Sequence, residues 1–281
     1  MSAEASPQTV PLEAKSPFEL RVDLSRNTPE SVIKQALATG DTGFLHSFTT
    51  GSTVDGPGVR LVAWTAGCHF KCSYCHNPDT WNMMNGMPVT LERAIDEIRK
   101  YRHGLEVMDG GFTLSGGEPL RQDRFAVRLF DAAKKMDVHT ALDTNGSLGE
   151  RLSDEELENI DLVMMSIKSV NPEKHLKITG KEAGPTLEFA RRLASMKRPM
   201  WLRFVLVPGL TDGDEDLEKM ANFVADLGNC ERVDMLPFHQ MGRYKWERLG
   251  LDYTLANVEP PSAEGVERAC ERFRAKGIVA Y

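Results

Sequence analysis

The segment GCHFKCSYCHNPDTW, residues 67–81, decides how the rest of the chain is interpreted, because it holds three of the five cysteines within eight residues. A regular helix would separate Cys68 from Cys75 by about 10 Å, at roughly 1.5 Å per residue. Thiolates of Cys68, Cys72 and Cys75 can therefore meet at one small centre only if the segment is a wrapped loop. Such a loop directly follows the first predicted strand.

Two kinds of centre fit three neighbouring thiolates. A structural zinc site normally has four protein ligands, and His69 or His76 can supply the fourth. His76 is adjacent to Cys75, however, and in most backbones it points away from a shared centre. A four-iron cluster held by three thiolates leaves one iron open to another ligand. The pattern favours the iron cluster and keeps zinc as the alternative. Cys230 and Cys270 lie far along the chain, and we assign both to helix packing.

Short apolar runs alternate with amphipathic segments from residue 41 onward, which predicts an α/β fold with a parallel sheet. Predicted strands cover 60–67, 111–116, 138–144, 161–168, 201–208 and 232–238. Predicted helices include 90–104 opened by Thr90, 186–198 opened by Thr186, 214–228 and 262–277, the last two ending at glycine. Six strand-helix units predict a barrel or part of one. Its functional residues should follow the carboxyl ends of the strands.

Composition limits the number of domains and the classes of partner. A chain of 281 residues with 41 % hydrophobic content predicts one catalytic domain, residues 41–281. Residues 1–40 are rich in Pro, Ser, Ala and Glu and form a predicted extension, either an appended arm or a flexible tail. Within it, a short helix is expected with Thr28 as cap, Pro29 in its first turn and Gly40 as its end.

The net charge is −7, with acidic and basic residues interspersed, which argues against nucleic acid or an anionic membrane as the main partner. The first residues lack the pattern of a secretory signal, and no run reaches the length of a membrane span. We therefore expect a cytoplasmic protein in which clustered cysteines bind metal.

The spacing Cys-x3-Cys-x2-Cys, with Tyr74 before the third cysteine, resembles the radical S-adenosylmethionine superfamily. Other motifs follow in order at the predicted strand ends: HSFTTGSTVDGPGVR (46–60), YCHNPDTW (74–81), TLSGGEPL (113–120), HTALDTNG (139–146), LRFVLVPGLTDG (202–213) and LPFHQMGRYKW (236–246). Together they resemble the pyruvate formate-lyase activating enzymes, and the resemblance covers nearly everything from residue 41. It implies a partial TIM barrel, the (β/α)6 radical SAM core.

The resemblance also implies a reaction. A reduced 4Fe-4S cluster, one per chain, cleaves S-adenosylmethionine to a 5′-deoxyadenosyl radical, which abstracts hydrogen from a glycine of pyruvate formate-lyase. The implied electron donor is reduced flavodoxin or ferredoxin, the setting is anaerobic, and the protein is expected to be a monomer.

The implied site residues fall on the quoted motifs. The cluster ligands are Cys68, Cys72 and Cys75, and the glycines of SGGEP let backbone groups approach a ligand's ammonium group. Lys168 and Arg203 can bring positive charge to a carboxylate, although such residues are often solvated ones whose stems pack on a sheet. The full expected cofactor-binding set is Tyr74, His76, Gly116, Gly117, Glu118, Ser166, Ile167, Lys168, Arg203 and His239.

A cation site and a substrate contact complete the expectations. Asp143 and Thr144 offer hard oxygen atoms, and the family implies a monovalent cation there, with the carbonyl of Met164 and a second Asp. Ser166 occupies that Asp position, so weaker cation binding is expected. Asp55 lies in a turn around Pro57, and the resemblance implies that it grips the substrate's glycine-bearing loop.

Three other functions remain open at this point. Activating enzymes of other glycyl-radical enzymes often carry an inserted region with further cysteines, and no cysteine lies between Cys75 and Gly116. This favours the pyruvate formate-lyase type. The second is a radical enzyme that acts on a small molecule. The third is a zinc-stabilised binding module without catalysis.

Overall fold

The computed structural model describes residues 30–281, and side chains from residue 34 onward. The expected cap Thr28 and the first-turn residue Pro29 lie outside the described residues. Helix α1 (Glu30–Thr39) ends before Gly40 as predicted. Gly40 has φ 72°, and a Cβ there would lie 2.6 Å from the backbone of Arg124, so only glycine fits. Helix α1 therefore lies against helix α3, and a separate extension over residues 1–40 stays a prediction.

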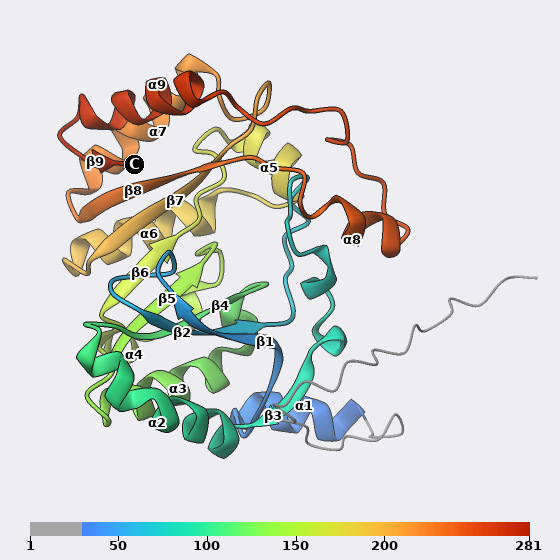
Figure 1. Ribbon diagram of the computed structural model, residues 1–281, viewed down its shortest axis with the longest axis vertical. Coiled ribbons are helices and arrows are strands. Elements are labelled where there is room, and N and C mark those ends of the chain that lie inside the picture. The colour runs from blue at the N-terminus through green and yellow to red at the C-terminus, as the bar shows by residue number, and fades with distance from the viewer. Residues whose placement is uncertain (1–29) are drawn as a thin grey trace, which may run out of the picture.

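In the described residues, nine strands form one sheet in the order β3-β1-β2-β4-β5-β6-β7-β8-β9, and its two ends do not pair (Figure 1). The sheet is mostly parallel, and only the pairs that β1 makes with β2 and β3 are antiparallel. It is thus an unclosed barrel, as expected. The strands are β1 (Thr42–Ser52), β2 (Arg60–Thr65), β3 (Met87–Thr90), β4 (Gly111–Gly116), β5 (His139–Thr144), β6 (Leu162–Met165), β7 (Met200–Leu206), β8 (Cys230–Pro237) and β9 (Val279–Ala280).

The six predicted strands are confirmed as β2 and β4–β8, whereas β1, β3 and β9 were not predicted. Strand β6 ends at Met165, three residues earlier than expected, so Ser166–Lys168 form a loop. Cys230 begins strand β8 instead of lying in a helix, but it is half-buried and packs against the main core, as expected of a small hydrophobic residue. Cys270 lies buried in helix α9, as expected.

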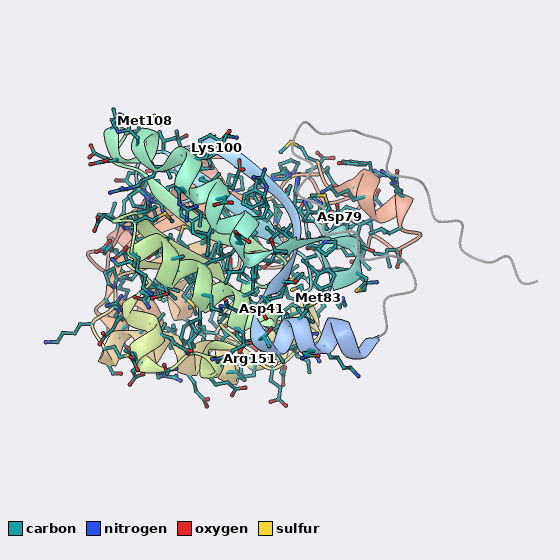
Figure 2. All side chains as sticks on the ribbon, turned by 90° about the horizontal axis from the view of Figure 1, so that it is seen from below. Asp41, Asp79, Met83, Lys100, Met108 and Arg151 are labelled. Atoms are coloured by element: carbon teal, nitrogen blue, oxygen red, sulfur yellow. The ribbon has the colours of Figure 1, made fainter. Side chains whose placement is uncertain are left out.

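The helices are α2 (Leu91–Val107), α3 (Asp123–Lys134), α4 (Asp154–Glu158), α5 (Pro172–Thr179), α6 (Gly184–Ser195), α7 (Asp214–Leu227), α8 (Arg243–Arg248) and α9 (Ala263–Arg274), with 3-10 turns η1 (Pro78–Thr80), η2 (Met83–Asn85), η3 (Pro119–Gln122) and η4 (Gly149–Arg151). Most helices cover the outer face of the sheet, whereas α8 lies apart from it and packs against η1 (Figure 1). Figure 2 shows Lys100 and Met108 on the outer surface of α2. No helix among residues 30–281 combines the length and apolar character needed to cross a membrane.

Two helix boundaries test the predicted caps. Thr90 caps α2 as expected, because its hydroxyl accepts a hydrogen bond from Arg93 N at 3.2 Å, but the helix continues past Gly104. Helix α6 begins at Gly184 instead of after Thr186, because Pro185 is well suited to a first helical turn. The hydroxyl of Thr186 instead donates to Asn145 O at 2.9 Å.

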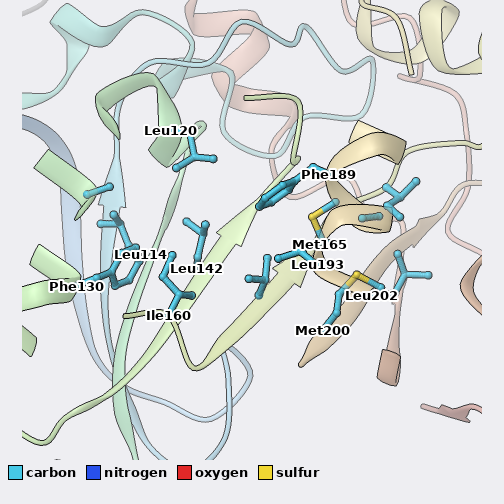
Figure 3. Packing of buried hydrophobic residues seen from close by; sticks show 14 of the residues in the cluster. Leu114, Leu120, Phe130, Leu142, Ile160, Met165, Phe189, Leu193, Met200 and Leu202 are labelled. Atoms are coloured by element: carbon cyan, nitrogen blue, oxygen red, sulfur yellow. The ribbon is translucent and has the colours of Figure 1, made fainter. Parts of the chain in front are cut away.

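The main core lies between the sheet and these helices (Figure 3). Leu142 of β5 and Met165 of β6 have no exposed surface, and both belong to one cluster with Phe130 of α3 and Phe189 of α6. Each such side chain contributes roughly 1.5–3 kcal/mol by leaving water. The packing fixes the strands in parallel, so their carboxyl ends share one edge of the sheet. The cysteines follow β2 at this edge.

Candidate active site

A cavity of about 440 Å³ opens at the carboxyl edge of the sheet. Its walls come from the loops that follow β2 and β4–β8. Most predicted site residues line this cavity: Cys68, Cys72, Tyr74, Cys75, His76, Gly116, Gly117, Asp143, Thr144, Ser166, Lys168, Arg203 and His239. Four predicted residues do not line it: Asp55, Glu118, Met164 and Ile167.

The cysteine loop, residues 67–77, is wrapped as its sequence requires. On one side, Gly67 N donates to Thr80 O at 2.6 Å. On the other, Lys71 N donates to Thr179 O at 2.9 Å, at the end of α5. Trp246 of α8 donates from its indole nitrogen to Cys75 O at 2.9 Å. Segments far apart in the chain thus hold the loop in place.

All three thiols lie in low-dielectric surroundings. Burial is the main cause that raises the pKa of Cys68 and Cys72, and it raises the pKa of Cys75 to about 12. Among the described residues, no three His, Cys, Asp or Glu side chains are close enough together to hold one metal ion. Ligation of a cluster requires the three thiols to lose their protons. Three soft sulfur donors on one loop fit a four-iron cluster.

The end of β4 requires two glycines. A Cβ on Gly116 would lie 2.2 Å from Thr65 N, and one on Gly117 would lie 2.7 Å from Gly67 O. The neighbouring backbone therefore requires glycine at both positions, and both residues line the cavity without a side chain.

Glu118 points away from the cavity. Its carboxylate accepts hydrogen bonds from Leu120 N at 3.0 Å, Asn145 N at 2.9 Å and the Thr144 hydroxyl at 2.8 Å. Complete burial raises the pKa of Glu118 to about 7, against the lowering effect of these donors. The side chain therefore connects the ends of β4 and β5, and only its backbone is left to contact a cofactor.

Below the cavity lies a buried charge network. Arg203 Nη1 lies 2.8 Å from Asp143 Oδ2 and 3.2 Å from Asp55 Oδ1. The hydroxyl of Ser115 donates to Asp143 Oδ2 at 2.7 Å, and that of Ser52 donates to Asp55 Oδ2 at 2.6 Å. Burial lowers the pKa of Arg203, but the two carboxylates outweigh it and the net shift is upward. Asp55 is 5 % exposed and does not line the cavity, whereas its partner Arg203 does.

Comparison with known proteins agrees with this arrangement. Residues 62–224 match the model of the Radical SAM superfamily. The chain is 45 % identical over 244 residues to the pyruvate formate-lyase-activating enzyme of Staphylococcus epidermidis, covering 84 % of this chain and 97 % of that relative. It is 42 % identical over 228 residues to the pyruvate formate-lyase 1-activating enzyme of Escherichia coli, covering 80 % and 93 %. This chain belongs to the radical SAM superfamily, in the pyruvate formate-lyase-activating enzyme family.

Solved structures of radical SAM proteins share the fold. A radical SAM methyltransferase from Sphaerobacter thermophilus superposes with a TM-score of 0.54 at 17 % identity, covering 90 % of this chain and 81 % of that one. A domain of the pyruvate-formate lyase-activating enzyme from Bacteroides vulgatus gives 0.51 at 22 % identity, covering 61 % and 98 %. Membership of the superfamily implies a 4Fe-4S cluster and S-adenosylmethionine as cofactors.

The radical SAM cavity has a polar wall after β6. Ser166 and Lys168 line the cavity, and Lys168 Nζ lies 5.8 Å from the centre of the Tyr74 ring. Ile167 points into the core instead and has no exposed surface. The side chain of Met164 is also buried, in a cluster with Trp201, so only its carbonyl can face a cation.

Helix α8 is held to the cysteine loop by Asp79. The carboxylate of Asp79 lies 3.2 Å from His46 Nε2 and 3.2 Å from Lys245 Nζ, and Lys245 also donates to Asn77 Oδ1 at 2.7 Å. Burial opposes ionisation, but the hydrogen bond from His46 and the charge of Lys245 lower the pKa of Asp79 to about 2. Nearby, the rings of His76 and His239 meet edge to face at 4.9 Å.

Some contributors to this site were not predicted. Ser115 and Asn145 line the cavity next to predicted residues, and Trp81 lines it beside η1. Trp246 supports the loop from α8. The two tryptophans lie within motifs already quoted, which was the available signal, but no local pattern pairs Trp246 with Cys75.

Proposed function

We propose that this protein activates pyruvate formate-lyase by removing a hydrogen atom from one of its glycine residues. When bound, the 4Fe-4S cluster and S-adenosylmethionine supply a 5′-deoxyadenosyl radical by one-electron reductive cleavage. The observation that supports this most is the single cavity shared by three thiols, a bare glycine pair and a lysine, in a chain that aligns with nearly the whole length of activating enzymes.

We assign cofactor roles by position around the cavity. Cys68, Cys72 and Cys75 ligate the cluster. The backbone at Gly116 and Gly117 takes the ammonium group of the methionine moiety, and Lys168 takes its carboxylate. Tyr74, His76, Ser166 and His239 contact the remaining polar groups, whereas Glu118 and Ile167 contribute backbone atoms.

Arg203 forms the floor of the site. Its Nη1 is taken by two carboxylates, while its buried Nε has no hydrogen-bond partner among the described residues. That nitrogen is free to donate to the cofactor or to a substrate carbonyl. Asp55 holds this arginine from below, and a grip on the substrate loop requires that pair to open.

A monovalent cation at Asp143, Thr144 and the Met164 carbonyl belongs to the proposal as a weak site. Asp143 Oδ2 is already contacted by Arg203 and Ser115, and the hydroxyl of Thr144 donates to Glu118. Ser166 adds a dipole where a second carboxylate would add a charge.

The cellular setting follows from the same assignment. We propose a cytoplasmic monomer that works without oxygen and takes its electron from reduced flavodoxin or ferredoxin.

Electron paramagnetic resonance tests the function. The reconstituted protein, S-adenosylmethionine and a reductant are incubated anaerobically with pyruvate formate-lyase. A glycyl-radical signal is expected, and none should form on a pyruvate formate-lyase variant whose radical glycine is replaced by alanine. A signal on another glycyl-radical enzyme and none on pyruvate formate-lyase would mean that the other enzyme is the substrate. Zinc with no iron or sulfide after anaerobic purification would point to a binding module.

A further inference from the structure

The cysteine loop has two chemically different sides. The side chains of Cys68, Phe70, Cys72 and Tyr74 line the cavity, whereas those of the intervening residues His69 and Lys71 do not. Lys71 is exposed, and His69 is partly exposed. The thiols therefore face the cofactor cavity. The residues between them form the opposite, outer side of the same loop.

Basic side chains from four segments gather on this outer side. They are Lys71 of the loop itself, Arg121 of η3, Arg151 of η4 and Lys181 after α5, all exposed, and we call them the basic patch. Figure 2 shows Arg151 at the surface.

Printed hydrogen bonds connect these segments to the loop. His69 Nε2 lies 2.8 Å from the Ser147 hydroxyl, just before η4. Arg151 Nη1 donates to Leu120 O at 3.2 Å, which joins η4 to η3. Ser73 N donates to Ile178 O at 3.0 Å, near the turn that carries Lys181. Hydrogen bonds therefore hold the segments that carry the four basic residues around the same loop.

Much of this positive charge is uncompensated. In residues 34–281, neither Arg121 nor Lys181 has a side-chain hydrogen bond or a carboxylate within ion-pair distance. Within the described part of the chain, Lys71 donates to Cys68 O and lies 4.5 Å from the centre of the Trp81 ring, with no carboxylate partner. Arg151 has one carboxylate partner there, Asp123 at 3.5 Å. Such a patch contrasts with a chain whose net charge is −7.

We propose that the basic patch is the docking surface for an acidic one-electron carrier protein, which reduces the cluster through the back of the cysteine loop. The proposal rests on the proposed function, because only a redox cluster at this loop needs a carrier. Complementary charge steers such encounters and raises the association rate by ten- to a thousandfold at low salt. Docking behind the loop leaves the cavity to the cofactor and the substrate glycine.

The test compares two reductants on the reconstituted protein. One is a reduced, strongly acidic flavodoxin, and the other is photoreduced deazaflavin, a small molecule that needs no docking surface. Cluster reduction is followed by bleaching of its visible absorbance, which requires no glycyl radical. Arg121→Glu and Lys181→Glu are the test variants. Lys197→Glu is the matched control, because Lys197 is exposed and lies before β7, at the opposite edge of the sheet.

At low salt, flavodoxin should reduce the cluster of each test variant about tenfold more slowly than that of the unaltered protein. The rate for Lys197→Glu should fall less than twofold. Raising the salt concentration should bring the reduction rates of the test variants closer to that of the unaltered protein. With deazaflavin, all four proteins should agree within twofold. Calorimetry with oxidised flavodoxin should show weaker binding by the two test variants than by the unaltered protein and Lys197→Glu.

Two outcomes would overturn the docking surface. Equal slowing with both reductants would mean that the basic residues only shape the loop, and unchanged flavodoxin rates would mean that the carrier docks elsewhere. Normal cluster reduction without any glycyl radical on pyruvate formate-lyase would count against the proposed function alone.

Discussion

The guanidinium of Arg203 lies 2.8 Å from the carboxylate of Asp143, and this pair forms the floor of the cavity. Both side chains are 14 % exposed, so neither charge is well solvated. Removing one partner of such a pair leaves the other charge buried and uncompensated, which costs several kcal/mol. The second carboxylate on Arg203, from Asp55, lies farther away and belongs to the loop between β1 and β2. The two acids should therefore respond differently to mutation.

Asp55→Ala should slow glycyl-radical formation about tenfold and leave cofactor cleavage without substrate nearly unchanged. Asp143 still holds Arg203 in this variant, while the loop that carries Asp55 loses its anchor. Asp143→Ala is the contrasting variant and should lower both activities. Product 5′-deoxyadenosine, measured with and without pyruvate formate-lyase, separates the two. Equal loss of both activities in Asp55→Ala would assign Asp55 to the floor of the cavity alone.

Iron content should depend on three cysteines only. Cys68→Ala, Cys72→Ala and Cys75→Ala should lose the cluster, whereas Cys230→Ala and Cys270→Ala should retain about four irons per chain, because a 4Fe-4S cluster with an open iron needs three thiolates. Iron and sulfide are measured after anaerobic reconstitution. A full complement of iron in Cys72→Ala would contradict the ligand assignment.

Lys168→Ala should keep the cluster and weaken S-adenosylmethionine binding by roughly 1.5–3 kcal/mol, the value of one hydrogen bond to a charged group. Lys177→Ala, an exposed lysine of α5 that does not line the cavity, serves as the control. Anaerobic calorimetry measures both. Equal affinity in the two variants would show that Lys168 is only a surface residue.

The Asp79 contact should make stability depend on pH. The pKa of Asp79 is about 2 in the folded protein and 3.8 ordinarily, so its ionised form stabilises the fold above about pH 4, by about 2 kcal/mol. The contribution is lost as pH falls towards 2. Urea unfolding of Asp79→Asn should therefore show the full loss at pH 7 and a smaller one near pH 3.

Asp96→Asn is the control for that measurement, because Asp96 pairs with Arg99 on the exposed face of α2. Its free energy of unfolding should change by less than about 1 kcal/mol at either pH. If the stability lost in Asp79→Asn does not vary with pH, the ion pair is not the cause of that loss.

Ser166→Asp should make cofactor binding more responsive to potassium. With Ser166 in place, Asp143 is the one charged group among the three proposed cation ligands. Its carboxylate also pairs with Arg203. Titration of S-adenosylmethionine binding against potassium compares the two proteins. Superimposable curves would mean that Ser166 has no bearing on a cation site.

Five of the six strands that the sequence predicted, β2 and β4–β7, are mostly buried, and their apolar runs are nearly continuous. The sixth, β8, alternates more buried with more exposed residues. Strand β1, TGFLHSFTTGS, was missed because its second half is polar and exposed, and the two-residue β9 is too short for any pattern. Both lie at or near the ends of the sheet, where pairing partners rather than composition create the strand.

Within the site, residue types and spacing predicted which loops meet, but not which way each side chain turns. Glu118 was expected at the cofactor, and its carboxylate connects two strand ends, because Thr144 and Asn145 offer it three hydrogen bonds; its contact with a cofactor stays a prediction. Asp55 was expected at the substrate; it is buried and pairs with Arg203, and its contact with the substrate stays a prediction. Both outcomes depend on partners from other strands, which no local pattern contains.

The hydrogen bond from Trp246 to Cys75 joins residues 171 positions apart. During synthesis, the cysteines leave the ribosome long before the helix that fixes their loop. The nascent chain therefore presents an unfinished loop, and iron-sulfur assembly factors meet its completed form only after most of the polypeptide has been made. The last contact that fixes the cysteine loop is thus available only after nearly 250 residues have been made.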